Sequence, residues 1–193
     1  NEKYNYKDIA VLYRTNVISR NIEMALIEAG IPYQIYGGFA FLKRREIKDV
    51  LSYLKFIMDP ENIFHFKRII NVPSRGVGEK TIDKLQEYMK EYNCDILSSI
   101  DIFKEHNNTS KTEALVKFKE TIEKLHNALI NLPLPEFFEL MLDETGYMEM
   151  LKEDAEVEEI NRIDNVKEFK SILYQLEYDN LDEELSRPEK IEI

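Results

Sequence analysis

With 193 residues and 44% hydrophobic content, the chain is long enough for one sizeable domain, or for one domain and part of another. Its apolar runs are far too short to span a bilayer, no signal-peptide pattern opens the sequence, and the lone Cys94 excludes an internal disulfide, so we expect a cytoplasmic protein without membrane contact. A net charge of −11 would argue against a nucleic-acid partner if it were spread evenly.

The charge is unevenly distributed along the chain. Residues 1–37 carry four basic and four acidic side chains, whereas residues 38–90 carry eleven basic against seven acidic, a net +4. Residues 91–193 carry eleven basic against twenty-six acidic, a net −15. A polyanion would therefore be attracted to the middle of the chain, while the acidic half would repel nucleic acid or dock a protein.

The first forty residues predict a strand, a helix and a second strand. Residues 8–13 (D-I-A-V-L-Y) form the continuous apolar run of a buried strand. A helix with Asn16 as its cap and Gly30 as its stop follows, and residues 32–36 predict the second strand. Two strands do not make a stable sheet alone, so we expect this β-α-β piece to belong to a larger sheet.

From Arg45 onward the apolar spacing is typical of helices. The first apolar stripe ends at Asp59 and Pro60, and it consists of Ile47, Val50, Leu51, Leu54, Ile57 and Met58. Further helices are predicted at about 62–70, 82–92, 95–104, 115–129, 136–144 and 157–176. We therefore expect a mainly α fold, with the β-α-β piece in residues 1–40, a helical domain in 41–180, and a tail in 181–193 that is a short strand or disordered.

Residues 71–81 (N-V-P-S-R-G-V-G-E-K-T) allow three interpretations. The phosphate-binding loop of an ATPase needs glycine directly before lysine and follows a strand. Here Glu79 separates Gly78 from Lys80 and the preceding segment is helical, so this interpretation fails. A clamp for a nucleic-acid backbone and an ordinary turn between helices both remain.

A helix–hairpin–helix element would explain the composition of this stretch. Gly76 and Gly78 permit a hairpin with positive φ, and Lys80 and Thr81 then begin a helix with free N–H groups at its positive end. Such an end offers a phosphate several backbone donors, with Arg75 and Lys80 as flanking charges. A G-V-G turn alone is weak support for this interpretation.

Three ordered stretches carry a family resemblance. They are residues 9–20 (I-A-V-L-Y-R-T-N-V-I-S-R), residues 31–49 (I-P-Y-Q-I-Y-G-G-F-A-F-L-K-R-R-E-I-K-D) and residues 66–78 (F-K-R-I-I-N-V-P-S-R-G-V-G). Together they closely resemble the superfamily 1A DNA helicases of the PcrA/UvrD/Rep group. The resemblance is strong over residues 6–90 and weaker over 161–169 (N-R-I-D-N-V-K-E-F).

The resemblance implies that the chain is a fragment of a longer helicase. Residues 1–40 would belong to the second RecA-like motor subdomain, called 2A, and residues 41–180 to its helical insertion, called 2B. The chain would then be a non-catalytic, DNA-binding and regulatory part of an ATP-dependent 3′→5′ helicase that unwinds DNA in repair and replication. Its partners would be duplex DNA, single-strand/duplex junctions and the remaining helicase subdomains.

The sequence lacks the residues that phosphoryl transfer requires. There is no Walker A loop, no D-E-x-Q-D box and no Q-motif, and the chain ends with R-P-E-K-I-E-I before the later helicase motifs could occur. We expect no catalytic residues and no cofactor in this chain, with ATP and Mg²⁺ bound elsewhere in the parent helicase. His65, His106 and His126 share no ligand spacing with each other or with Cys94, so no metal site is expected.

The resemblance also implies three groups of DNA-related residues. Single-strand contacts would involve Arg14, Asn16 and Arg20, although Asn16 could serve merely as a helix cap. A hinge and basic cluster would contain Gly37, Gly38, Lys43, Arg44, Arg45 and Lys48, or would be surface charge partly neutralised by Glu46 and Asp49. Contacts with duplex DNA would involve Ser74, Arg75, Gly76, Val77, Gly78, Lys80 and Thr81.

A second function remains possible on the sequence alone. The acidic helices could dock protein partners such as RNA polymerase or mismatch-repair factors, making the chain an interaction or autoinhibitory module with little DNA binding of its own. Salt-sensitive duplex binding that Arg75→Ala weakens would favour the DNA-binding function. Binding of protein partners that Arg75→Ala leaves unchanged would favour the alternative.

Overall fold

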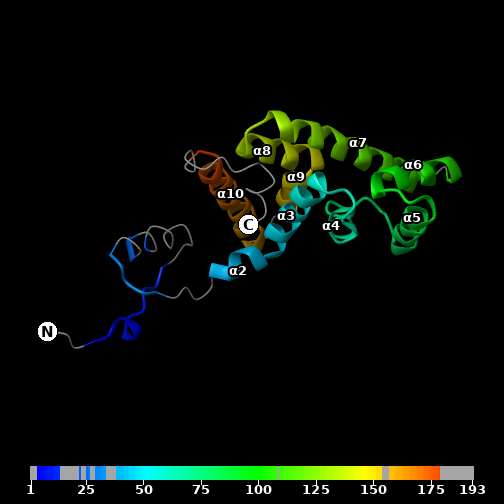
Figure 1. Cartoon of the computed structure of the whole chain (residues 1–193). Coiled ribbons are helices and arrows are strands. Elements are labelled where there is room, and N and C mark those ends of the chain that lie inside the picture. Colours follow the sequence, from blue (N-terminus) through cyan, green and yellow to red (C-terminus); the bar gives the residue numbers. More distant parts are fainter. Residues whose placement is uncertain are drawn as a thin grey trace. The chain divides into compact units, whose positions relative to one another are not determined.

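The computed structural model describes residues 4–13, 22, 25, 26, 29–33, 38–107, 109–153 and 157–178, without the side chains of 38–40 and 157–161. The chain divides into two compact units, residues 1–44 and residues 45–193. The described residues lie in helices or in loops, and none of them lies in a strand (Figure 1). The predicted mainly α fold is therefore confirmed at this level.

The first unit differs from the predicted β-α-β piece. A 3₁₀ helix, η1 (Tyr6–Asp8), begins it and the helix α2 (Gly38–Lys43) ends it. The strand predicted at 8–13 is wrong, because residues 9–13 make no strand pairing and Leu12 is 95% exposed. An apolar run becomes a strand only beside another strand. Residues 31–33 are not in a strand either, and 34–36 lie outside the described residues.

Gly30 ends the predicted helix of this unit as expected. Its φ of +64° lies in the left-handed region, which glycine occupies without steric cost. The N–H of Ile31 donates to the carbonyl of Leu26 at 2.9 Å, which is the hydrogen bond of a Schellman ending.

The described part of the second unit consists of helices joined by loops. Its helices are α3 (Arg45–Met58), α4 (Ile63–Ile69), α5 (Glu79–Tyr92), α6 (Ile96–His106), α7 (Ser110–Asn131), α8 (Leu134–Thr145), α9 (Tyr147–Glu153) and α10 (Val157–Tyr178). All except α9 coincide with a helix predicted from the apolar spacing. With seven residues, α9 is too short to show a period of its own.

Capping residues fix where several of these helices begin and end. Asn62 Oδ1 accepts from the N–H groups of Phe64 and His65 at the start of α4, and Asp95 Oδ1 accepts from Ser98 N–H at 2.7 Å at the start of α6. Gly146, with φ of +69°, ends α8. These caps orient the loops between the helices.

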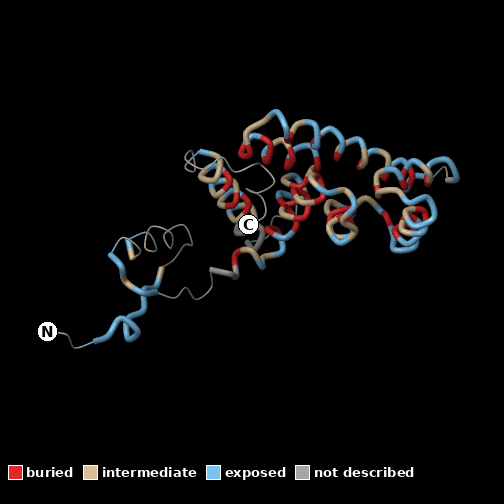
Figure 2. The backbone as a smooth tube through the Cα atoms, viewed as in Figure 1, coloured by how far each residue is buried: buried red, intermediate tan, exposed pale blue. Residues whose placement is uncertain are grey.

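Helix α3 lies at the centre of the unit and packs against α4, α7 and α10 (Figures 1 and 2). The rings of Phe56, Phe66 and Phe118 join α3, α4 and α7, with centroids 5.7–6.0 Å apart. Each such ring contributes about 1.5–3 kcal/mol by leaving water. Helix α7 runs from the α5–α6 pair at one end to α8 at the other (Figure 1). It therefore connects the α5–α6 pair with the helices around α8.

None of the helices within the described residues is long and apolar enough to cross a membrane.

Candidate nucleic-acid interface

The glycine-containing stretch forms a loop between α4 and α5, residues 70–78, which we call the 70–78 loop. The side-chain amide of Asn71 closes it by pairing with the backbone of Val77. Asn71 Nδ2 donates to the Val77 carbonyl at 2.5 Å, and Asn71 Oδ1 accepts from the Val77 N–H at 3.0 Å. Val77 is 1% exposed, and Gly76 supplies the turn with a φ of +68°. The amide therefore holds the loop as a closed ring.

The N-terminus of α5 is open at the end of this loop. Gly78 is its N-cap and has no side chain to accept a hydrogen bond. Its carbonyl accepts from Thr81 and Ile82 at 3.0 and 3.2 Å, whereas Glu79 and Lys80 lie too early in the helix to have an intrahelical acceptor. Gly78, Glu79 and Lys80 are exposed. The loop thus presents backbone donors at the positive end of a helix dipole.

The backbone requires glycine at one of these two positions and not at the other. At Gly76 the positive φ requires glycine, although a Cβ there would meet nothing within 4 Å. At Gly78 φ is −78°, which any residue adopts, and a Cβ would again meet nothing within 4 Å. The fold therefore does not require glycine at 78.

Arg75 is directed into the protein. Its Nη1 donates to the carbonyls of Ile69, Ile70 and Pro73 at 3.2, 3.2 and 3.1 Å. Its Nη2 donates to the Thr145 carbonyl and to the Tyr53 hydroxyl, both at 3.2 Å. These contacts give Arg75 a structural role that the sequence did not predict, and its contact with DNA stays a prediction.

The loop is also fastened to α3 and α8. The Tyr53 hydroxyl donates to the Val72 carbonyl at 2.6 Å, and Pro73 Cγ would lie 3.9 Å from a Cβ at Gly146. Burial raises the pKa of Tyr53, and the neighbouring Arg75 charge opposes that effect. The base of the loop is therefore anchored to two helices beyond its own.

The remaining residues predicted to contact duplex DNA divide by exposure. Ser74, Gly76, Gly78 and Lys80 are exposed, whereas the side chain of Thr81 is turned inward and is 7% exposed. Val77 and Thr81 could therefore contribute to a contact only by supporting the backbone around them.

Most of the charged side chains in the predicted basic cluster are exposed. Lys43, Arg45 and Lys48 are exposed, and Arg44 lies over the Phe41 ring at 5.4 Å. Glu46 and Asp49, which could partly neutralise this surface, are both buried. Gly38 is the first residue of α2.

The buried carboxylates take part in a polar network within the second unit. Asp49 accepts from Arg68 at 2.7 Å and from the Tyr147 hydroxyl at 3.2 Å, and Glu46 Oε1 accepts from Asn165 at 2.6 Å. Burial raises the pKa of Asp49, and the Arg68 charge offsets part of that effect. The network ties α3 to α4, α9 and α10.

Some predicted residues cannot be placed. Arg14, Asn16, Arg20 and Gly37 lie outside the described residues, so the single-strand contacts stay predictions.

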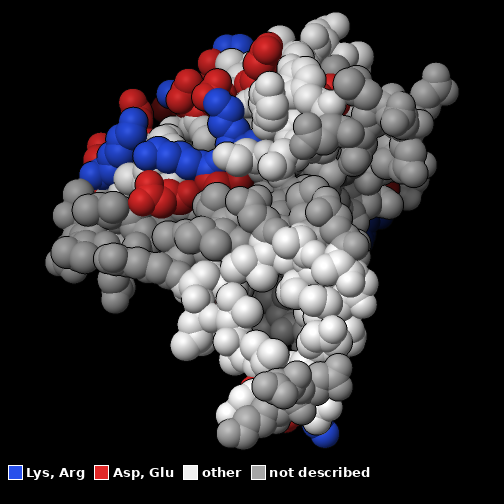
Figure 3. All heavy atoms as spheres, turned by 90° about the vertical axis from the view of Figure 1, so that its left-hand side faces the viewer, with Lys and Arg blue, Asp and Glu red and all other residues white. Residues whose placement is uncertain are grey.

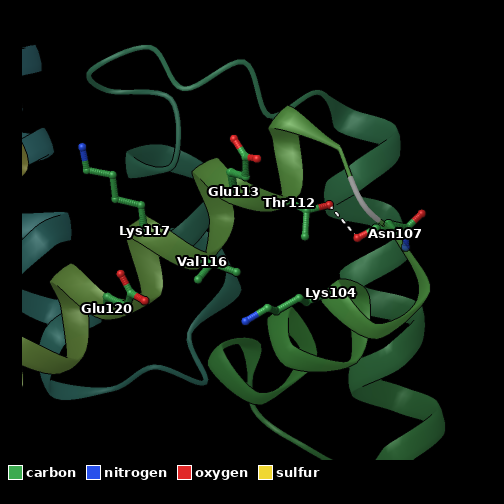
Figure 4. A pocket seen from close by; sticks show the side chains of 7 residues that line it. All are labelled: Lys104, Asn107, Thr112, Glu113, Val116, Lys117 and Glu120. Carbon is green, nitrogen blue, oxygen red and sulfur yellow. Dashed lines mark hydrogen bonds between the residues drawn. The ribbon is translucent and has the colours of Figure 1, made fainter.

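A hollow of about 660 Å³ lies between the end of α6 and the start of α7 (Figure 4). Its lining carries both charge signs and consists of Lys104, Asn107, Thr112, Glu113, Val116, Lys117 and Glu120. The Thr112 hydroxyl donates to the Asn107 carbonyl, and no set of donors converges on one point in the hollow. Within the described residues, no group of three or more His, Cys, Asp or Glu is placed to hold a metal ion.

Opposite charges are mixed elsewhere on the surface. On the face in Figure 3, described basic and acidic side chains lie next to one another. Lys124 of α7 pairs with Glu144 of α8 at 2.7 Å, and Lys170 of α10 pairs with Glu139 of α8. Exposed pairs of this kind contribute little stability, about 0–1 kcal/mol each.

The fold and loop together define a helical domain with an open helix N-terminus at a glycine turn, an arrangement suited to holding phosphate oxygens. Residues 1–192 match the family model of the UvrD-like helicase C-terminal domain, and the chain belongs to that family.

Relatives in several bacteria support this assignment. The chain is 39% identical over 184 residues to the ATP-dependent DNA helicase PcrA of Bacillus subtilis (strain 168), covering 95% of this chain and 25% of the relative. It is 36% identical over 170 residues to the PcrA of Leuconostoc citreum, covering 86% and 23%. The PcrA of Staphylococcus aureus (strain Mu50 / ATCC 700699) is 37% identical over 172 residues, with 86% and 23% covered. The predicted resemblance is confirmed, and the chain spans about a quarter of the length of these relatives.

Proposed function

We propose that this chain is the non-catalytic, DNA-gripping part of an ATP-dependent 3′→5′ DNA helicase. The 70–78 loop and the first turn of α5 would contact the backbone of duplex DNA. The observation that carries the proposal is the open N-terminus of α5 at Gly78, where a capping side chain would fit the protein and none is present.

The chemistry of this end suits a phosphate. Ser, Asp or Asn at an N-cap stabilises a helix by accepting from its first N–H groups, and glycine leaves those donors to an outside acceptor. A missing Cβ also allows a phosphate oxygen to approach the backbone closely. Lys80 adds an exposed positive charge one residue into α5 and past Glu79. Such contacts position a duplex without reading its sequence.

The rest of the helicase would supply the other functions. The relatives are named ATP-dependent DNA helicases, and we expect ATP and Mg²⁺ to be held by parts of the parent enzyme other than this chain. Arg14, Asn16 and Arg20 would contact the single strand in the intact enzyme.

The test compares two lysines of one helix. Lys80 lies in the first turn of α5 and Lys90 in its last turn, and both are exposed. Fluorescence anisotropy of labelled duplex, junction and single-stranded DNA is measured with the chain over a range of salt concentrations. We expect duplex affinity near the non-specific range of ~10⁻⁴–10⁻⁶ M, falling with salt. Lys80→Ala should lower it and reduce the salt slope by about 0.9, while Lys90→Ala should leave both unchanged.

Two results would contradict the proposal. Equal effects of Lys80→Ala and Lys90→Ala would mean that the chain attracts DNA only through its general charge. No duplex binding at low salt would favour the alternative, in which the acidic helices dock a protein partner such as RNA polymerase or a mismatch-repair factor.

A further inference from the structure

We infer that Arg75 is a positioning residue, which holds the 70–78 loop in its DNA-gripping shape and does not itself bind phosphate. The inference rests on the proposed function, since it names what keeps the gripping loop in place. It replaces the expectation that Arg75 is a charge flanking the phosphate.

The guanidinium joins the C-terminal ends of two helices. Ile69 is the last residue of α4 with Ile70 as its C-cap, and Thr145 is the last residue of α8. Carbonyls at these positions have no intrahelical donor, and they carry the negative end of the helix dipole. A cation placed between them supplies both the hydrogen bonds and the opposite charge. Thr145 is 70 residues from Arg75 in sequence, so the link is a tertiary one.

The hydrogen-bonding capacity of Arg75 is nearly exhausted by the protein. A guanidinium has five N–H donors, of which four are on the two Nη atoms. Those four serve five acceptors, namely the carbonyls of Ile69, Ile70, Pro73 and Thr145 and the Tyr53 hydroxyl. The guanidinium also lies over the Phe118 ring at 5.3 Å. A phosphate that recruited Arg75 would have to break these contacts.

The shape of the side chain matters as much as its charge. Arg75 reaches five acceptors because its guanidinium is a planar fork with two donor groups, whereas lysine offers a compact charge with three donors. Arg75→Lys should therefore keep the positive charge and lose the anchor. Arg75→Ala loses both.

The experiment measures duplex affinity, its salt slope, and hydrogen exchange of the Val77 amide in the 193-residue chain. The Val77 N–H is a suitable probe because it donates to Asn71 inside the closed loop. We expect Arg75→Ala and Arg75→Lys each to weaken duplex binding by about tenfold, with an unchanged salt slope and faster exchange at Val77. Lys80→Ala should reduce the slope by about 0.9 without changing the exchange.

The opposite pattern overturns the inference. If Arg75→Ala reduces the slope by about 0.9, Arg75→Lys restores it, and exchange at Val77 stays unchanged, Arg75 is a phosphate ligand. If Arg75→Ala fails to fold, Arg75→Lys and Tyr53→Phe decide the question. Tyr53→Phe removes one acceptor of Arg75 and the bond to Val72, and we expect faster exchange at an unchanged slope.

The inference and the proposed function can fail separately. Faster exchange at Val77 in Arg75→Lys, in a chain that does not bind duplex, would support the anchor and refute the DNA contact. Unchanged exchange in a chain that does bind duplex would refute the anchor alone.

Discussion

Gly76 and Gly78 show that the same type of residue can be necessary for the fold at one position and unnecessary for it at another. The positive φ at Gly76 makes glycine necessary for the turn. At Gly78 the backbone is ordinary and the surrounding space is open, so glycine there sacrifices a helix cap. A position that costs stability without a packing reason is a candidate for function.

Gly78→Ser should therefore raise the stability of the chain and weaken its binding of duplex DNA. A serine hydroxyl would cap α5, and the unfolded chain would lose some freedom, which together raise the free energy of unfolding by about 0.5 kcal/mol. The same hydroxyl would occupy the donors offered to phosphate, so duplex affinity should fall. Urea unfolding and anisotropy on the same preparation measure the two effects.

Gly76→Ser is the control for this change, because its positive φ predicts a loss of stability instead. Unchanged duplex affinity in a stabilised Gly78→Ser chain would argue against a close approach of phosphate at this position.

At the scale of single residues, the sequence predicted what depends on local geometry. Gly30 was predicted as a helix stop, and the glycine turn was predicted before α5. The roles of Arg75 and Asn71 were not predictable, because they depend on partners that folding brings together, and Thr145 is 70 residues from Arg75. The inward direction of the Thr81 side chain was not predictable either, because a small polar side chain gives no indication of which way it faces.

At the scale of elements, α3 has buried residues that its periodic apolar stripe does not predict. Four of its six predicted apolar positions, Ile47, Val50, Leu54 and Ile57, are at most 1% exposed, whereas Leu51 and Met58 are half-buried. Glu46, Asp49 and Tyr53 are buried as well, because α3 is covered on more than one side and its polar groups have partners on other helices. An amphipathic pattern predicts one buried face, and it does not predict a helix enclosed by three others.

The buried tyrosine hydroxyls around α3 should make the folded chain less stable at alkaline pH. Burial and the nearby Asp49 carboxylate raise the pKa of Tyr147 above its ordinary 10.0, and burial likewise raises that of Tyr53. A hydroxyl whose pKa is higher in the folded chain stabilises it fully below pH 10, and this stability is lost as the pH rises further. Each group contributes up to about 1.4 kcal/mol per pH unit.

Tyr147→Phe should accordingly make the free energy of unfolding less dependent on pH in the alkaline range, by up to about 1.4 kcal/mol per unit. It should also cost about 1 kcal/mol at neutral pH, where the hydrogen bond to Asp49 is lost. Urea titrations below and above pH 10 measure both quantities. Tyr92→Phe, which removes an exposed hydroxyl, is the matched control, and a slope equal to that of wild type in Tyr147→Phe would refute the assignment.

At the scale of the whole molecule, the described core lies within one stretch of the chain. Every described apolar side chain that is buried falls between Phe41 and Leu173. The apolar side chains of Ile9, Val11 and Leu12 are 60%, 55% and 95% exposed, since the sheet expected from the family resemblance is not formed by the described residues. The apolar run predicted a buried strand here, but strand pairing depends on neighbours that a single run does not specify.

Deletion of residues 1–37 should therefore leave the cooperative unfolding of the chain intact. We expect a melting temperature within about 4 °C of the full chain, which corresponds to less than about 1 kcal/mol. Self-association at high concentration should decrease, because exposed extended apolar segments promote pairing between chains. Calorimetry and light scattering measure the two effects, and loss of the cooperative transition would show that the helical core depends on the deleted residues.

The continuity of α7 has a mechanical consequence. Twenty-two residues at about 1.5 Å each make a rod of about 33 Å, uninterrupted by glycine or proline, with α5 and α6 packed near one end and α8 at the other. A tilt of about 10° about one end displaces the other by about 6 Å, nearly two base-pair steps of ~3.4 Å. Helix α7 is in this sense a lever: a small rotation at α8 would be magnified at the α5–α6 end, where the proposed DNA contact lies.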